Sequence, residues 1–389
     1  GRSGWLANGA RVHYRFMDYR KDQVTVSITF AGGNIEESAG TIGRTGVGTL
    51  AWNRPATSKL SSNDIRDLMT GKKIRVGGGA GADLVGLSVS GSPADLEFGM
   101  QLAHLLMTDP VVEQAAFDQW VKQQKLAISQ RKLEARGVLS ELLAEAVYPA
   151  DEARVRPMTE AQVDSLTAAE GQARLRDVLA KGPIEVAVVG DIDRRTALEL
   201  VARYVGSLPA RARIGATTLD ALRGVKPLPG PVNEHRQFKT TTDQAIGVSG
   251  FYGVDARNLL DVRLMSMAAR ILTTRATEQI REQKQLAYSP SVGSTPGTEY
   301  PALGIVAMVS PTAPDKVQAL LDATREMYDA FAKDGPSETE METAKKQMAN
   351  TLDEQMREPG FWLGVLGSIE YRGRTLASVM EAPAAYQGF

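Results

Sequence analysis

The chain has 389 residues and a mass of 41.9 kDa, which is long for a single hydrophobic core and predicts two domains. Its net charge of −1 and pI of about 6.4 leave no basic excess for binding nucleic acid phosphates. No apolar run reaches the ~18 residues of a transmembrane helix. The absence of cysteine excludes disulfides, thiolate metal sites and a cysteine nucleophile, and it fits both periplasm and cytoplasm.

The first half of the chain alternates strand patterns with long helices. Residues 23–30 and 84–90 predict strands, because apolar and small polar residues alternate in them. Ser92-Pro93-Ala94-Asp95 predicts a capping box that opens a helix through Leu106, and a second long helix is expected over 117–135. The glycine run between the two strand-like stretches, 77–81, predicts a flexible hairpin.

The same order returns in the second half at an offset of about 220 residues. Residues 244–251 and 303–310 predict strands, and a helix is expected from Pro314 to about Lys333. Ser337-Glu338-Thr339-Glu340 predicts a capping box that opens another long helix to about Met356. Strands followed by paired helices favour an α+β fold of two homologous domains, each a mostly antiparallel sheet with helices packed on one face.

A linker and two unequal repeats follow from this pattern. In the first repeat, residues 184–191 predict a buried strand and 194–205 a helix. Residues 209–236 are rich in proline and glycine and have little periodicity, so they predict a linker between domains 1–208 and 237–389. The counterpart of 184–191 would fall beyond the last residue, so the second repeat is expected to be truncated, and the Gly1-Arg2-Ser3-Gly4 start suggests that something precedes the chain.

One segment of the second repeat carries a family resemblance. Residues 281–288 read R-E-Q-K-Q-L-A-Y and resemble the R-E-x-x-x-L-A-Y segment of the pitrilysin/insulinase zinc metallopeptidases. Residues 9–16 with 23–37 resemble the family's opening hairpin and acidic turn, and residues 184–209 resemble its V-V-V-G-D strand and helix. The resemblance extends over almost the whole chain and implies two domains of the mitochondrial-processing-peptidase type.

The zinc-binding H-x-x-E-H of that family is missing. Where the family has T-G-L-A-H-F-L-E-H, this chain has T-G-V-G-T-L-A-W-N over 45–53. The two histidines are replaced by Thr49 and Asn53, the glutamate by Trp52, and the third ligand falls near Gln130. Zinc prefers imidazole, thiolate or carboxylate ligands, and a metal-bound water needs a carboxylate base, so no metal-binding or catalytic residue is expected in this chain.

The histidines give no second route to a metal site. His13, His104 and His235 fall in a first strand, a capped helix and the linker. No pair of them has the spacing of metal ligands, so three unrelated imidazoles are expected.

The resemblance implies a function in partnership. The chain would be the non-catalytic half of a zinc endopeptidase, inactive alone, that forms a clamshell chamber for peptides with an H-x-x-E-H half in the same polypeptide or in a separate subunit. Arg281 and Tyr288 would bind substrate, zinc would be in the partner half, and no nucleic acid partner or membrane span is expected. A periplasmic location is expected, with cytoplasm as the alternative. Two other functions stay open: a structural subunit similar to the core proteins of the respiratory bc1 complex, and a stand-alone peptide-binding module.

Overall fold

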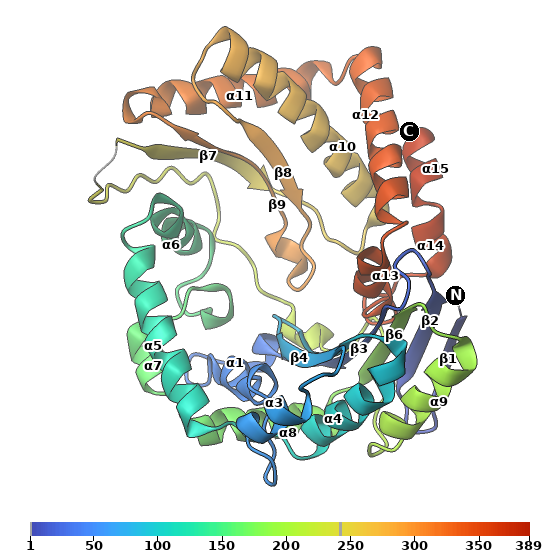
Figure 1. Ribbon diagram of the computed structural model, residues 1–389. Helices are drawn as coiled ribbons and strands as arrows, with labels where there is room; N and C mark the ends of the chain where they lie inside the picture. Colours follow the sequence, from blue (N-terminus) through green and yellow to red (C-terminus); the bar gives the residue numbers. More distant parts are fainter. Residues whose placement is uncertain (1, 241–242) are drawn as a thin grey trace. The chain divides into compact units, whose positions relative to one another are not determined.

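The computed structural model describes residues 2–240 and 243–389, and these form two compact units. Unit 1 consists of Gly1–Lys125, Met158–Leu222 and Glu354–Val379. Unit 2 consists of Leu126–Pro157, Arg223–Asp353 and Met380–Phe389. Each unit combines a β-sheet with helices, so the predicted α+β class is confirmed (Figure 1).

The compact units differ from the expected sequence repeats in two segments. Leu126–Pro157 lies in the first repeat by sequence but packs in unit 2, and Glu354–Val379 lies in the second repeat but packs in unit 1. The physical reason is that contacts between apolar side chains define a core, and a segment can make these contacts in either unit whatever its position in the chain. We call Glu354–Val379 the strap.

Unit 1 contains a six-stranded sheet in the order β1-β2-β6-β3-β5-β4, in which only β2 and β6 are parallel neighbours. The strands are β1 (Arg2–Trp5), β2 (Arg11–Phe16), β3 (Val24–Ala31), β4 (Ile74–Ala80), β5 (Leu84–Gly91) and β6 (Ile184–Gly190). The predicted strands at 23–30, 84–90 and 184–191 are therefore confirmed. The glycines 77–79 lie inside β4, which corrects the predicted flexible hairpin: only the turn after Ala80 links β4 to β5.

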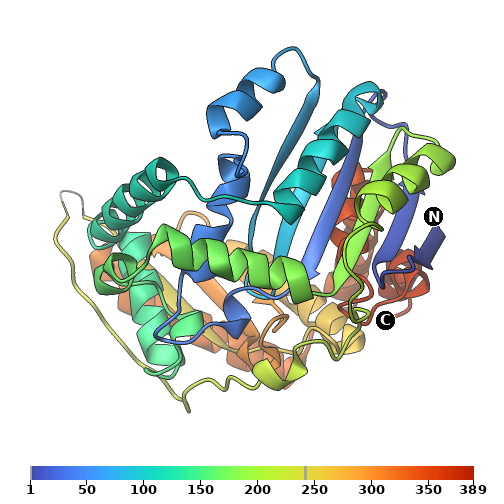
Figure 2. The same cartoon turned by 90° about the horizontal axis from the view of Figure 1, so that it is seen from below.

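One face of this sheet is covered by helices that build the main core. Val26, Ile28 and Phe30 of β3 are buried in it, as alternation predicts. Figure 2 shows the helices of this layer from below. The helices of unit 1 that precede the strap are α1 (Arg44–Gly48), α2 (Leu50–Asn53), α3 (Ser62–Leu68), α4 (Leu96–Thr108), α7 (Glu160–Asp164), α8 (Ala168–Lys181) and α9 (Arg194–Tyr204), together with the first part of α5 (Gln114–Arg131).

The strap covers part of the opposite face. Ala187 and Val189 of β6 pack against Trp362 and Leu366 of α13 (Pro359–Leu366), so β6 is buried on both faces. Helix α14 (Leu376–Met380) follows α13. The sequence pattern did not predict this layer, because a short apolar helix carries no signal of which sheet it will cover.

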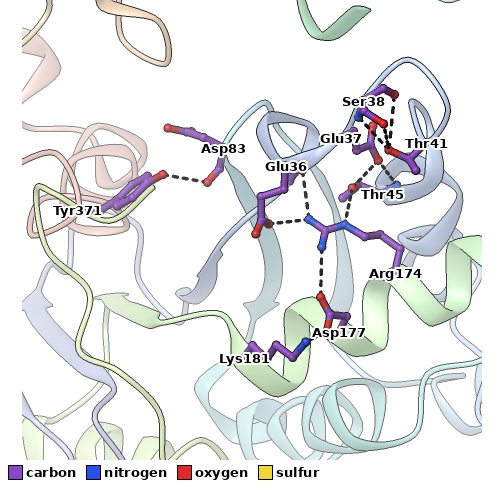
Figure 3. Close-up of polar contacts among 11 residues, drawn as sticks. Glu36, Glu37, Ser38, Thr41, Thr45, Asp83, Arg174, Asp177, Lys181 and Tyr371 are labelled. Atoms are coloured by element: carbon purple, nitrogen blue, oxygen red, sulfur yellow. Dashed lines mark hydrogen bonds and ion pairs between the residues drawn. The ribbon is translucent and has the colours of Figure 1, made fainter. Parts of the chain in front are cut away.

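Polar contacts fix the strap to the sheet. The buried Glu185 carboxylate accepts hydrogen bonds from the backbone N–H groups of Glu370 (2.8 Å) and Tyr371 (3.1 Å). Arg372 forms a two-pronged ion pair with Asp83 at 2.6 and 2.8 Å. The Tyr371 hydroxyl donates to the Asp83 carbonyl, as Figure 3 shows. Such charge-assisted, bidentate contacts specify geometry as well as contributing free energy.

Unit 2 contains a three-stranded antiparallel sheet in the order β7-β9-β8. The strands are β7 (Ala245–Tyr252), β8 (Ser291–Thr295) and β9 (Ile305–Thr312), which confirms the predicted strands at 244–251 and 303–310. Strand β3 of unit 1 has neighbours on both sides, whereas β7 pairs with β9 alone. Among the described residues, no strand of unit 2 takes the place that β6 has beside β3.

Helices lie on both sides of β7 (Figure 1). Val306 and Met308 of β9 form a core with Leu272 of one helix and Leu320 and Met327 of another. Helix α6 (Ala135–Val147), which belongs to the first repeat by sequence, also contacts β7. The helices of unit 2 are α6 (Ala135–Val147), α10 (Leu259–Ala276), α11 (Val317–Asp334), α12 (Glu338–Gln355) and α15 (Ala382–Gln387).

Two of the predicted helix starts can be compared with the structure. Ser337 and Glu340 exchange the hydrogen bonds of a capping box before α12, as predicted. Ser92 caps Ala94 as expected, but the Asp95 carboxylate accepts the Lys73 N–H instead of closing a capping box, so this detail is corrected. None of the described helices is both long and apolar enough to cross a membrane.

Candidate functional site

The segment that would carry the zinc motif, 45–53, forms two short helices, α1 and α2, which meet at Thr49. The Thr49 hydroxyl is buried and donates to the Gly46 carbonyl at 2.9 Å. Asn53 is exposed at the end of α2. These side chains replace the two histidines, and neither brings an imidazole to the site.

Trp52 fills the position of the catalytic glutamate with a core side chain. Its ring is 0% exposed and its indole N–H donates to the Leu106 carbonyl at 3.0 Å. A Cβ on Gly78 of β4 would lie 2.6 Å from the Trp52 ring, so the glycine leaves room for the indole. Gly78 of the glycine run therefore serves packing, which periodicity could not reveal.

The residues present do not fit a zinc ion. A hydroxyl that is already bonded, a buried indole and an exposed amide supply no soft or charged ligand. Gln130, the counterpart of the third ligand, is an exposed residue of α5. Within residues 2–240 and 243–389, no group of three His, Asp or Glu side chains is placed to hold a metal ion.

A polar network fixes the start of α1 (Figure 3). The buried Glu37 carboxylate accepts the Gly43 N–H at 2.9 Å and both the N–H and the hydroxyl of Thr45 at 2.6 Å. The Arg174 guanidinium donates to Glu36 at 2.6 Å and to the Thr45 hydroxyl at 3.3 Å. These groups satisfy one another, so we assign the network to positioning α1. Sequence reasoning missed it because Glu36 and Arg174 are 138 positions apart.

The histidines serve separate contacts. His13 is buried in β2, where its Nε2 lies 2.7 Å from Glu185 Oε1 and its Nδ1 lies 2.8 Å from the Ser3 hydroxyl. His104 Nδ1 lies 2.8 Å from the Tyr204 carbonyl, and His235 is exposed. They form no common site within the described residues.

Arg281 and Tyr288 lie together on the surface of unit 2. The Arg281 guanidinium carbon is 4.9 Å from the centroid of the Tyr288 ring, and the ring is 80% exposed. The residues just before them, Ile280 and Ala287, are buried in the core with β9. The buried Ile280 and Ala287 anchor the backbone at two points, and the guanidinium and the phenol that follow them stay on the surface.

The backbone around the pair is irregular and well anchored. Arg281 lies in a π-helical turn, Thr277–Gln283, and Tyr288 lies in the loop before β8. Gln285 has a φ of 53°, a left-handed conformation, and its carbonyl accepts the Lys316 ammonium at 3.0 Å. Single π-helical turns occur frequently at functional sites.

The pair offers two kinds of hydrogen-bond donor to a ligand. A guanidinium presents a planar fork and a phenol presents one hydroxyl, and both suit a carbonyl or carboxylate oxygen. Neither group supplies a metal ligand or a general base near neutral pH. Both side chains can therefore donate hydrogen bonds to an oxygen of a bound ligand.

Comparison with known proteins finds one family model and several solved structures of similar fold. The family model of the peptidase M16 inactive domain matches residues 166–348. The structure of a peptidase M16 inactive domain from Pseudomonas fluorescens has a TM-score of 0.79 and 17% identity, with 100% of this chain and 91% of that chain covered. No curated protein sequence matches significantly.

Two further structures have similar folds. The periplasmic protease PqqL from Escherichia coli has a TM-score of 0.74 and 18% identity over 100% of this chain, which spans 43% of PqqL. A chain of complex III2 from Candida albicans has a TM-score of 0.74 and 15% identity, with 100% of this chain and 90% of that chain covered. Residues 166–348 thus match the inactive domain of the M16 peptidases, the pitrilysin-type family that the sequence resembles, and the chain as a whole has the fold of these solved structures.

Proposed function

We propose that this chain is the non-catalytic half of a pitrilysin-like zinc peptidase and that it holds peptide substrates for a zinc-bearing partner half. The observation that carries the proposal is the exposed Arg281–Tyr288 pair, anchored on a turn whose neighbouring residues are buried. The second support is that Trp52 is buried as a core residue where a catalytic base would stand.

The proposed division of labour follows from the side chains. The zinc of the partner half would supply the activated water, because this chain lacks metal ligands in its motif. Arg281 and Tyr288 would donate hydrogen bonds to a peptide carbonyl, which fixes the register of the peptide and stabilises charge on that oxygen. The two halves would enclose the peptide in a clamshell chamber. Because PqqL is a periplasmic protease, we propose the periplasm as the location.

The test combines this chain with an H-x-x-E-H half encoded in the same reading frame or in an adjacent gene. We expect each half alone to leave an unfolded peptide intact and the mixture to hydrolyse it, with association visible by analytical ultracentrifugation. The mass-matched control is the mixture of the zinc half with an unrelated protein of equal mass. Hydrolysis by the zinc half alone at the rate of the mixture would contradict the proposal.

A second candidate is a structural subunit, which the similarity to a chain of complex III2 favours. This reading predicts stable association with a partner but no dependence of any peptidase activity on Arg281 or Tyr288. The same reconstitution separates the two: a complex that forms without turnover supports the structural function.

A further inference from the structure

A basic hollow lies on the sheet of unit 1, and none of its lining residues belongs to the degenerate zinc motif. It has a volume of about 470 Å³ and is located where β3 and β4 begin and β5 ends. It is lined by Gln23, Lys72, Lys73, Ile74, Arg75, Ser90 and Gly91. We call this feature the basic hollow.

Strand register places polar side chains of three strands together at this hollow. Thr25, Ser90 and Arg75 are cross-strand neighbours on β3, β5 and β4. Because Val76 and Val89, the next residues along the two strands, are buried in the core, Arg75 and Ser90 point to the opposite face. Thr25 and Ser90 are joined by a hydrogen bond of 2.8 Å between their hydroxyls.

The backbone at the hollow has a defined shape. Gly91 has a φ of 153°, and a Cβ there would lie 2.1 Å from the Lys73 carbonyl oxygen. Only glycine allows this approach of β5 to the start of β4. The Ser92 N–H then donates to the Lys73 carbonyl at 2.7 Å, which holds the two strand ends together.

The charge of the hollow is positive. Among the described residues that line it, three are cationic and none is acidic. The nearest acid that contacts them, Asp95, already accepts the Lys73 N–H at 2.8 Å and lies 3.6 Å from the Lys72 ammonium. Lys73 and Arg75 are exposed, and neither forms an ion pair within the part of the chain that the structure describes.

We propose that the basic hollow binds the carboxylates of an acidic peptide segment, with Lys73 and Arg75 as the ionic contacts and Gln23, Thr25 and Ser90 as polar neighbours. The choice of a peptide rests on the proposed function, and the choice of an acidic one rests on charge complementarity. The hollow would then determine which peptides the assembly prefers. The partner half plays no part in this binding.

The experiment measures binding to the chain alone by fluorescence anisotropy at low salt. The probes are fluorescein-labelled peptides of six glutamates, six lysines and alternating glycine and serine. We expect the glutamate peptide to bind more tightly than the others and to weaken as salt is added, because ions screen exposed charges. Lys73→Gln/Arg75→Gln should weaken it about five- to tenfold, the effect of losing two exposed ion pairs.

The matched control is Lys122→Gln/Lys132→Gln, which removes two exposed cations in and just after α5. It should change the affinity less than twofold, and both double variants should melt at the wild-type temperature. Arg75→Glu is the second variant, and it should weaken binding further than Arg75→Gln.

Three outcomes would overturn the proposal: no preference for the glutamate peptide, equal losses in both double variants, or binding of tripolyphosphate at the hollow without binding of the glutamate peptide. Because the assay contains no zinc half, its failure leaves the reconstitution result unaffected. A successful reconstitution with no peptide binding at the hollow would place the specificity elsewhere.

Discussion

At the scale of single residues, Trp52 shows why one substitution would not restore a zinc site in this chain. Its indole is buried and bonded to the Leu106 carbonyl. Trp52→Phe should lower the free energy of unfolding by about 1–3 kcal/mol, because it leaves that carbonyl without a donor. Trp52→Glu should cost more, because it buries a carboxylate without a partner. Urea unfolding followed by circular dichroism checks both.

Trp120→Phe, at a half-buried position of α5, is the control. An unchanged midpoint for Trp52→Glu would refute the assignment of Trp52 to the core.

Arg281 and Tyr288 carry the prediction on substrate contact. Tyr288→Phe removes one hydroxyl and should raise the activation barrier of the reconstituted peptidase by about 2–4 kcal/mol, the range for losing a donor to a transition-state oxygen. Arg281→Lys should also reduce turnover, because an ammonium lacks the planar fork.

Stability should barely change in either variant, since the Tyr288 ring is 80% exposed. Peptide turnover and thermal melting are measured together, with Tyr19→Phe, another exposed tyrosine, as the control. Wild-type turnover in both variants would mean that the pair has no substrate role.

Glu340 gives a pH-dependent contribution to stability. Its hydrogen-bonded pairing with Arg275 at 2.6 and 2.8 Å, assisted by Ser337, lowers the pKa of the carboxyl from 4.5 to about 2. A lowered pKa in the folded state means that the contribution is present above about pH 4.5 and is lost as the pH falls toward 2.

Glu340→Gln should therefore lower the free energy of unfolding by about 1 kcal/mol at pH 7, a figure reduced for solvent screening, and by less near pH 2. Chemical unfolding at several pH values checks this. Glu342→Gln, whose partner Lys345 lies 3.0 Å away on the same helix, is the exposed control. A gap between wild type and Glu340→Gln that stays constant down to pH 2 would contradict the assignment.

At the scale of elements, the strap is the part of the fold that local pattern could not assign. Helix α13 of the strap buries Trp362 and Leu366 against β6. The backbone N–H groups of Glu370 and Tyr371 in the strap donate hydrogen bonds to the Glu185 carboxylate. A contact between a strand and a segment 185 positions away depends on the closed fold. The same holds for α6, which belongs to the first repeat by sequence and packs in unit 2.

Glu185→Gln tests how the strap is held. The amide keeps one acceptor oxygen but turns an NH₂ group toward the backbone N–H of either Glu370 or Tyr371, so that buried donor loses its partner. The free energy of unfolding should fall by about 1–3 kcal/mol, and hydrogen exchange at Glu370 and Tyr371 should accelerate. Glu358→Gln, which removes the exposed 3.3 Å pair with Arg20 in the same strap, should have little effect. Equal exchange rates in the two variants would show that Glu185 does not hold the strap.

At the scale of the whole molecule, the prediction concerns metal and activity. The chain alone should bind no stoichiometric zinc and hydrolyse no peptide, since its motif positions read Thr49, Trp52, Asn53 and Gln130. The measurement is metal analysis after chelation and zinc re-addition, with peptide turnover in parallel. One tightly bound zinc per chain together with peptidase activity would overturn the proposed function.

Much of the architecture could be predicted because it rests on local pattern. Alternation or an apolar run located β3, β5, β6, β7 and β9, and a serine followed three positions later by glutamate located the start of α12. The pairing of Arg281 with Tyr288 on one surface was inferred from the resemblance, and the structure brings the two side chains together. Their backbone could not be predicted, since a π-helical turn and a left-handed residue at Gln285 have no simple sequence signature.

The sequence by itself determined β3, β5, β6, β7 and β9 and the loss of the zinc ligands, because strand pattern and ligand chemistry are properties of residue type and order. Only the tertiary structure decided that Trp52 is core, that Glu185 holds the strap and that Lys73 and Arg75 share a hollow with Ser90. Each of these depends on which distant segments touch, and burial is settled by contacts that form when the whole chain has folded.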